Sequence, residues 1–139
     1  MNEQKFDFWQ DHSAKYLEMA LSRENDEIIS APDGYAKKTG VCGDTIEFFI
    51  VIHNDVIKHI THHINGCQNT YACANAIVRL VQGRRINHAW EITPEKVAAF
   101  LETLPADHFH CAELAVGALY LALASVQETR RAPWKKHYR

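Results

Sequence analysis

Residues 40–64 read GVCGDTIEFFIVIHNDVIKHITHHI, and this stretch decides the fold. The run 45–52 is rich in β-branched and aromatic residues, and a second such run, 56–64, follows after three polar residues. Asn54 and Asp55 tolerate the left-handed conformation of a tight turn, so the two runs predict a β-hairpin. Because the first run is almost continuously apolar, we expect helices to cover both of its faces.

The sequence on either side of the hairpin predicts helices and one further strand. Ala31-Pro-Asp-Gly34 has turn chemistry, and a loop or short edge strand then runs to Cys42. Together the segments predict an α+β fold: a small antiparallel sheet of about three strands, with an N-terminal helix and a C-terminal helical layer packed on it. The expected helices are residues 5–21, a helix between Gly66 and Gly83, a helix capped by Thr93 and ended by Pro105, and a last helix capped by Asp107 and apolar over 112–126.

Composition predicts a single folded domain over residues 1–139, with 47% hydrophobic and 23% charged residues. The net charge of −2 excludes an overall basic surface for nucleic acid. The tail 130–139 carries five Lys or Arg and no acid, so the rest of the chain stands at −7. This tail is interpreted either as a frayed, solvated end or as a docking strip for an acidic partner.

The first ten residues, MNEQKFDFWQ, carry acids and amides where a secretory signal has basic and apolar residues. No apolar run approaches the roughly 18 residues of a membrane helix. We therefore expect a cytoplasmic protein with no membrane contact. In reducing cytosol its four cysteines are expected to be thiols, available for metal binding or catalysis.

Three of these cysteines occupy comparable places. Cys42 precedes a strand, Cys67 lies where a strand gives way to a helix, and Cys111 lies in the first turns of a helix. Helix N-termini favour the thiolate, which is the metal-binding form, so these thiols are expected to converge on one ion. Three thiolates with one imidazole or carboxylate suit zinc, iron or an iron–sulfur cluster. The absence of a Cys-x-x-Cys pair argues against a zinc finger.

Two residues compete for the fourth ligand position. Asp44 offers a hard carboxylate, which holds an iron–sulfur cluster less firmly than a thiolate and suits a site that releases its cluster. It can equally be a turn residue that accepts local backbone hydrogen bonds. His110, adjacent to Cys111, can be a ligand, a proton donor or a partner of a ligand.

Three segments, GVCGD, NGCQNTYACANAIVRLVQGR and HCAELAVGALYLAL, resemble the cluster-ligand segments of the IscU/NifU N-terminal type of iron–sulfur assembly scaffold. They occur in the family's order over roughly residues 34–126, about two-thirds of the chain. The resemblance implies a labile 2Fe-2S cluster built from Fe(II) and persulfide sulfur. Its cluster-binding and metal-binding residues would be Cys42, Asp44, Cys67, His110 and Cys111, with Cys111 as the catalytic persulfide acceptor and zinc as an occupant in purified protein.

The resemblance also implies partners. Sulfur would come from a cysteine desulfurase and the cluster would pass to apo-proteins. Electrons would come from a separate donor such as a ferredoxin, since the chain has no flavin or nicotinamide fingerprint. A homodimer is left open. The family segment Leu-Pro-Pro-Val-Lys, which recruits an Hsp70-type chaperone, is here Leu104-Pro-Ala-Asp-His108, and a Pro-Arg-Asn-type segment is missing near the N-terminus, so the chaperone contact and the usual desulfurase surface are not carried over.

Two other functions remain open. One is a zinc-dependent persulfide acceptor of the SufU type, although the 44-residue step from Cys67 to Cys111 shows no sign of the insertion that such proteins carry. The other is a structural zinc module for protein interaction, in which removal of the metal would unfold the domain.

Several conspicuous residues are expected to lie outside the site. His59 and His63 would stand about 13 Å apart on one face of a strand, with His62 on the opposite face, and all three are interpreted as surface or half-buried residues. Cys73 is interpreted as a buried structural thiol. Trp9 is expected to pack the N-terminal helix.

Overall fold

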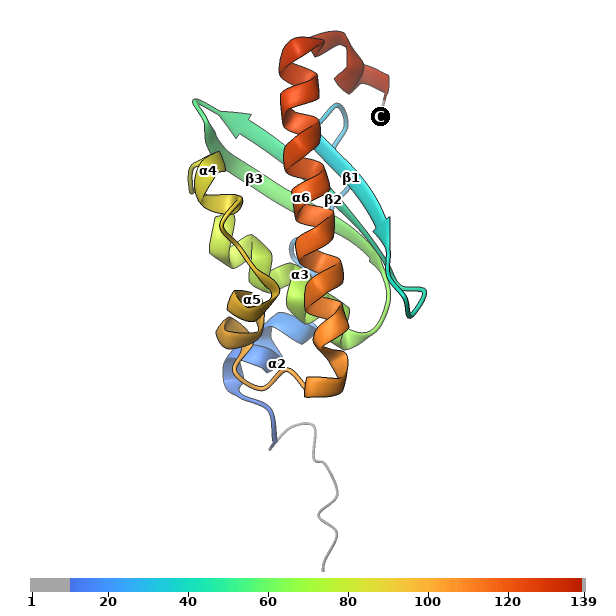
Figure 1. The fold of residues 1–139 in the computed structure, drawn as a ribbon, viewed down its shortest axis with the longest axis vertical. Coiled ribbons are helices and arrows are strands. Elements are labelled where there is room, and N and C mark those ends of the chain that lie inside the picture. Colours follow the sequence, from blue (N-terminus) through green and yellow to red (C-terminus); the bar gives the residue numbers. More distant parts are fainter. Residues whose placement is uncertain (1–10, 139) are drawn as a thin grey trace, which may run out of the picture.

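A three-stranded antiparallel sheet forms the centre of the computed structural model, which describes residues 11–138 (Figure 1). Its strands follow the order of the chain: β1 (Gly34–Thr39), β2 (Thr45–His53) and β3 (Val56–Asn65). The register pairs Phe48 with His62, and a bulge interrupts it between Val51 and Ile52. The α+β prediction, with its hairpin and edge strand, is therefore confirmed.

The helices form a layer on one face of the sheet (Figure 1). α6 crosses β1 and β2, and α2 packs on α3. Their bounds are α2 Ala14–Leu21, α3 Gln68–Val81, α4 Ile86–Ala89, α5 Pro94–Leu101 and α6 Phe109–Arg131, with 3₁₀ helices η1 Ala106–His108 and η2 Pro133–Tyr138.

The expectation that helices cover both faces of β2 is wrong for the described residues. Thr61 and Phe49 face away from the helical layer. On this face a segment without regular structure covers Thr61, and the Tyr35 ring packs on Phe49. The Thr61 hydroxyl donates to the carbonyl of Glu27, and the Phe49 ring packs beside that of Tyr35 with centroids 5.2 Å apart. Phe49 is still only 5% exposed, which explains the unbroken apolar run in the sequence.

The hydrophobic core lies between the sheet and α6, where Phe48, Ile50, Ile60, Leu119 and Leu123 are fully buried. The segment 106–131 has the length and apolar composition of a membrane-crossing helix, contrary to the expectation that no such stretch exists. However, 56% of its most apolar window is buried inside the fold. A buried core helix of a folded domain can have the same length and hydropathy, so these two properties are only weak evidence for a membrane-spanning helix.

Local signals at the helix ends explain where the predicted bounds were right or wrong. Thr93 caps α5 by accepting from the Lys96 N–H, as predicted. α2 begins at Ala14 behind its cap Ser13, so His12 and Ser13 interrupt the helix predicted over residues 5–21; residues 5–10 of that prediction, Trp9 among them, lie outside the described residues. Asp107 does not cap α6, because η1 incorporates it and places His108 at the cap position.

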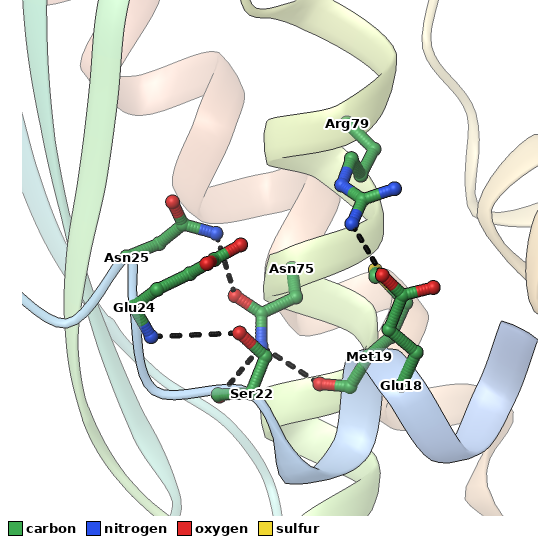
Figure 2. Close-up of polar contacts among 7 residues, drawn as sticks. All are labelled: Glu18, Met19, Ser22, Glu24, Asn25, Asn75 and Arg79. Atoms are coloured by element: carbon green, nitrogen blue, oxygen red, sulfur yellow. Dashed lines mark hydrogen bonds and ion pairs between the residues drawn. The ribbon is translucent and has the colours of Figure 1, made fainter.

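A buried polar network ties α2 to α3 (Figure 2) and reaches β3 through His62. The Asn75 side chain donates to the carbonyls of Met19 and Ser22, at 2.7 and 3.1 Å, and accepts from Asn25. It also lies 2.8 Å from Nε2 of His62. His62 faces opposite to His59 and His63 as predicted, but it is fully buried rather than at the surface. Cys73 is a buried free thiol, as predicted.

The basic C-terminal segment lies at the end of α6 that is remote from the N-terminal helix (Figure 1). It was interpreted as a frayed end or a docking strip, and the structure shows it helical, in α6 to Arg131 and then in η2. Arg130 contacts Asp55 of the β2–β3 turn at 2.6 Å, and Lys135 contacts Glu128 at 3.3 Å.

Candidate metal centre

Three connections between elements bring the predicted ligands to one end of the molecule. Cys42 and Asp44 lie on the turn between β1 and β2, Cys67 is the N-cap of α3, and Cys111 is the third residue of α6. The turn is tight, because Gly40 N–H donates to the Asp44 carbonyl at 2.9 Å and Gly43 has φ of +90°. Glycine adopts this left-handed conformation without steric cost, and Cys42 remains exposed at the tip.

Thr70 connects three of these groups. Its hydroxyl donates to Asp44 Oδ2 at 2.7 Å and lies 3.6 Å from the sulfurs of both Cys67 and Cys111. The Cys67 N–H donates to the same carboxylate oxygen at 3.1 Å. Gly66 makes this approach feasible, because a Cβ there would stand 2.7 Å from Asp44 Oδ2. The carboxylate is thus held against the start of α3.

The tightest group of ligand atoms includes a residue that sequence reasoning missed. Among the described residues, the sulfurs of Cys67 and Cys111 and one ring nitrogen of His108 lie within 4.8 Å of one another. The sequence favoured His110 because it adjoins Cys111, but the 3₁₀ turn that ends at His108 brings the other ring to the thiols. The repeated histidine in Asp107-His-Phe-His110 was the available signal.

His110 lies on a different side of Cys111. It lines a pocket of about 170 Å³ together with the β1–β2 turn, where Gly40 and Val41 are its neighbours. Its ring centroid is 5.6 Å from that of His108. His108 therefore lies in the close group with the thiols and lines the pocket beside α3, whereas His110 lines the pocket beside the β1–β2 turn.

Burial and hydrogen bonding act in opposite directions on the acidic groups of the site. Burial raises the pKa of the Cys111 thiol to about 12, and a hydrogen bond from Thr70 only partly opposes it. The expectation that a helix N-terminus favours the Cys111 thiolate is thus wrong for the metal-free site. Burial also opposes ionisation of Asp44, but hydrogen bonds from Thr70 and Cys67 outweigh it and hold the pKa of that carboxyl below its ordinary value.

A pocket of about 430 Å³ is lined by His108, which belongs to the close group of ligand atoms. Tyr16 lines it and donates a hydrogen bond to Asn69, and the His12 ring stacks on Tyr16 with centroids 3.7 Å apart. The lining residues are His12, Tyr16, Gln68, Asn69, Pro105, Asp107 and His108.

The donor set fits a thiophilic cation. Two thiols and an imidazole are soft to intermediate ligands, which zinc, iron and iron–sulfur clusters prefer and magnesium and calcium do not. His108 Nδ1 is buried with no hydrogen-bond partner among the described residues. Cys42 and Asp44 lie on the β1–β2 turn and offer two further ligands. These groups can hold a metal ion while leaving one side open to solvent.

Residues 16–132 match the sequence model of the NifU-like N terminal domain, and the chain belongs to this family. The curated relatives include an iron–sulfur cluster assembly scaffold protein IscU from Aquifex aeolicus, 26% identical over 81% of this chain and 74% of that protein. An IscU from Plasmodium falciparum is 33% identical over 63% of this chain and 53% of that protein. The matched region thus spans between half and three quarters of these two relatives.

Solved structures show the same fold. The N-terminal part of a NifU-like protein from Brucella abortus aligns with a TM-score of 0.69 at 15% identity, covering 84% of this chain and 94% of that one. A protein from Fervidobacterium islandicum AW-1, described as a scaffold for iron–sulfur cluster assembly in the SUF system, aligns with a TM-score of 0.65 at 14% identity, covering 84% and 99%.

Proposed function

We propose that this protein is a scaffold on which iron and persulfide sulfur combine into a labile 2Fe-2S cluster that is then passed to apo-proteins. The observation that carries the proposal is the convergence of Cys67, Cys111 and an imidazole within 4.8 Å, beside Cys42 and Asp44, in a NifU-like fold. The relatives named as IscU assembly scaffolds support it. On this proposal the cluster is cargo and the protein works in the cytoplasm.

The proposed cluster ligands are Cys42, Cys67 and Cys111, with Asp44 as the residue that governs lability and one of the two imidazoles near Cys111 as an alternative ligand. Asp44 suits its role, because the Thr70 hydroxyl and the Cys67 N–H hold its carboxylate beside the thiols through Oδ2 and leave Oδ1 as a ligand atom. A hard carboxylate holds an iron–sulfur cluster less firmly than a thiolate does, which favours release.

Sulfur is proposed to arrive from a cysteine desulfurase, with Cys111 as acceptor. The Cys111 sulfur attacks the outer sulfur of the donor persulfide, a new S–S bond forms, and the donor leaves as a thiolate. Two electrons from a separate protein such as a ferredoxin then reduce the transferred sulfur to sulfide and restore the Cys111 thiolate. Because Cys111 is buried, this transfer requires a local opening that exposes its sulfur to the donor.

Anaerobic reconstitution with Fe(II), cysteine and a cysteine desulfurase tests the proposal. Wild type should develop the visible absorption and Mössbauer signature of a 2Fe-2S cluster, Cys111→Ser should not, and Asp44→Ala should hold its cluster longer. Cys73→Ala is the matched control, because Cys73 is also a buried thiol but is outside the ligand group, and it should assemble a cluster.

A zinc-dependent persulfide acceptor is the second candidate, favoured by the same two thiols and imidazole, which also suit tetrahedral zinc. The reconstitution separates the two functions. A wild-type protein that forms no cluster, retains one tightly held zinc ion and gains a persulfide detectable by mass spectrometry would be the zinc acceptor.

A further inference from the structure

His108 has the surroundings of a metal ligand without a competing role. One of its ring nitrogens lies within 4.8 Å of both the Cys67 and the Cys111 sulfur. Its Nδ1 is buried and has no hydrogen-bond partner among the described residues. A buried polar nitrogen without a partner is costly, and a metal bond to the imidazole is one way to use such a ring.

The Asp44 carboxylate, by contrast, already accepts two hydrogen bonds. The Thr70 hydroxyl and the Cys67 N–H both donate to its Oδ2, which keeps the carboxylate at the start of α3. It is not part of the close group that Cys67, His108 and Cys111 form. In this arrangement the non-thiolate ligand nearest to the two sulfurs is the imidazole and not the carboxylate.

We propose that Cys67, His108 and Cys111 form the entry site for a single Fe(II) ion, in which His108 rather than His110 supplies the imidazole. Cys42 and Asp44, on the β1–β2 turn outside this close group, then take part only when the second iron and sulfide arrive. The assignment rests on the proposed function in taking Fe(II) as the natural ion, while the ligand set itself also suits zinc.

The distances are compatible with such a site. Metal–sulfur bonds of about 2.3 Å and metal–nitrogen bonds of about 2.0 Å in a tetrahedron place the ligand atoms roughly 3.6 to 3.8 Å apart. The observed separations are at most 4.8 Å, so side-chain shifts of about 1 Å suffice to close the group on an ion. The pocket of about 430 Å³ is lined by His108, a member of this group.

Titration of the metal-free protein with Co(II) and Zn(II), under anaerobic conditions, tests the assignment in wild type, His108→Ala and His110→Ala. His110→Ala is the matched control. It removes an imidazole that is also partly buried but that lines the pocket beside the β1–β2 turn and lies outside the close ligand group. Loss of a ligand should cost at least the roughly tenfold in affinity that loss of a supporting partner costs, so His108→Ala should bind both ions at least about tenfold more weakly. His110→Ala should bind like wild type.

X-ray absorption of the zinc-loaded proteins gives a second readout, because a bound imidazole has a characteristic scattering pattern. We expect wild type and His110→Ala to show one imidazole and His108→Ala to show none, while circular dichroism verifies that all three are folded. The assignment is overturned if His108→Ala retains wild-type affinity and its imidazole, or if His110→Ala loses as much as His108→Ala does. A wild type that binds Co(II) through His108 but never assembles a cluster would refute the proposed scaffold function and leave this metal site standing.

Discussion

A single hydroxyl organises the candidate centre at the residue scale. Thr70 is fully buried, and its oxygen contacts the Asp44 carboxylate and the sulfurs of Cys67 and Cys111. The hydroxyl donates to Asp44 Oδ2 at 2.7 Å, and its longer contact of 3.6 Å with the Cys111 sulfur partly opposes the burial that raises the pKa of that thiol. Thr70 therefore contacts both the carboxylate and the sulfurs of the candidate centre.

His62 should make the stability of the protein pH-dependent. Burial lowers the pKa of His62 below its ordinary value of 6.5, although a hydrogen bond with Asn75 partly opposes this. The unfolded chain therefore takes up a proton near pH 6.5 while the folded chain does not. Its contribution to stability is complete above that pH and is lost as the pH falls below it, with a slope of up to about 1.4 kcal/mol per pH unit.

Urea denaturation between pH 5 and pH 8 measures this effect. Wild type should lose stability below pH 6.5, and His62→Gln should show a flatter profile even if it is less stable throughout. His12, whose pKa burial also lowers, remains in both proteins and accounts for the residual slope. Parallel profiles for the two proteins would contradict the assignment to His62.

Individual ligands were predictable from sequence where a recognisable strand or helix adjoins them. The patterns of the neighbouring strands and helices correctly placed Cys42, Cys67 and Cys111 at the ends of elements. Which of the two histidine rings approaches the thiols could not be predicted. The choice between His108 and His110 depends on a 3₁₀ turn of three residues, which is too short to show a periodic pattern. Burial of Cys111 was likewise invisible, because it depends on the packing of α6 against other elements.

At the scale of elements, patterns with a clear period gave correct predictions. The β-branched runs of β2 and β3 and the capped start of α5 appear where the sequence placed them. The four-residue α4 and the turn η1 are too short to show a period, so they were missed or misread as loop and cap. The irregular cover over Thr61 was missed because it arises from a segment far away in the sequence.

The attachment of α2 depends on Asn75 (Figure 2). Asn75→Ala removes two donors to the carbonyls at the end of α2 and the acceptor for Asn25 and His62, all of which are partly or fully buried. We expect a loss of about 3 kcal/mol in the free energy of unfolding, measured by urea denaturation. Arg79→Ala, on the same helix, breaks only the exposed contact with Glu18 and should cost about 1 kcal/mol or less.

Equal losses for the two variants would contradict this account, because they would mean that the exposed ion pair and the buried amide hold α2 with similar strength. The comparison is controlled by position, since both residues lie in α3 and contact the same helix.

At the scale of the whole molecule, the metal centre lies at the edge of the hydrophobic core. Cys111 belongs to the core, but most core residues lie between the sheet and the helices, and Cys42 and Cys67 are exposed at one end. We therefore expect chelator-treated protein to keep its helical circular dichroism and a cooperative thermal transition. Zinc should raise the stability only by mass action, by about 2.7 kcal/mol at a free concentration 100 times the dissociation constant.

Loss of helical signal on chelation would contradict this expectation and would instead support the structural zinc module, for which metal binding and folding are one event. A control with added Mg²⁺ should leave the melting temperature unchanged, since two thiols and an imidazole do not suit that ion.

The length of α6 has a consequence for how the molecule can be handled. Cys111 lies in the first turn of this helix and Arg131 at its last residue, which places them about 30 Å apart along the axis. An extended peptide needs about nine residues to span that distance. A short tether or a dye attached at the C-terminal end should therefore leave the thiols accessible, so that cargo can be exchanged while the molecule stays attached.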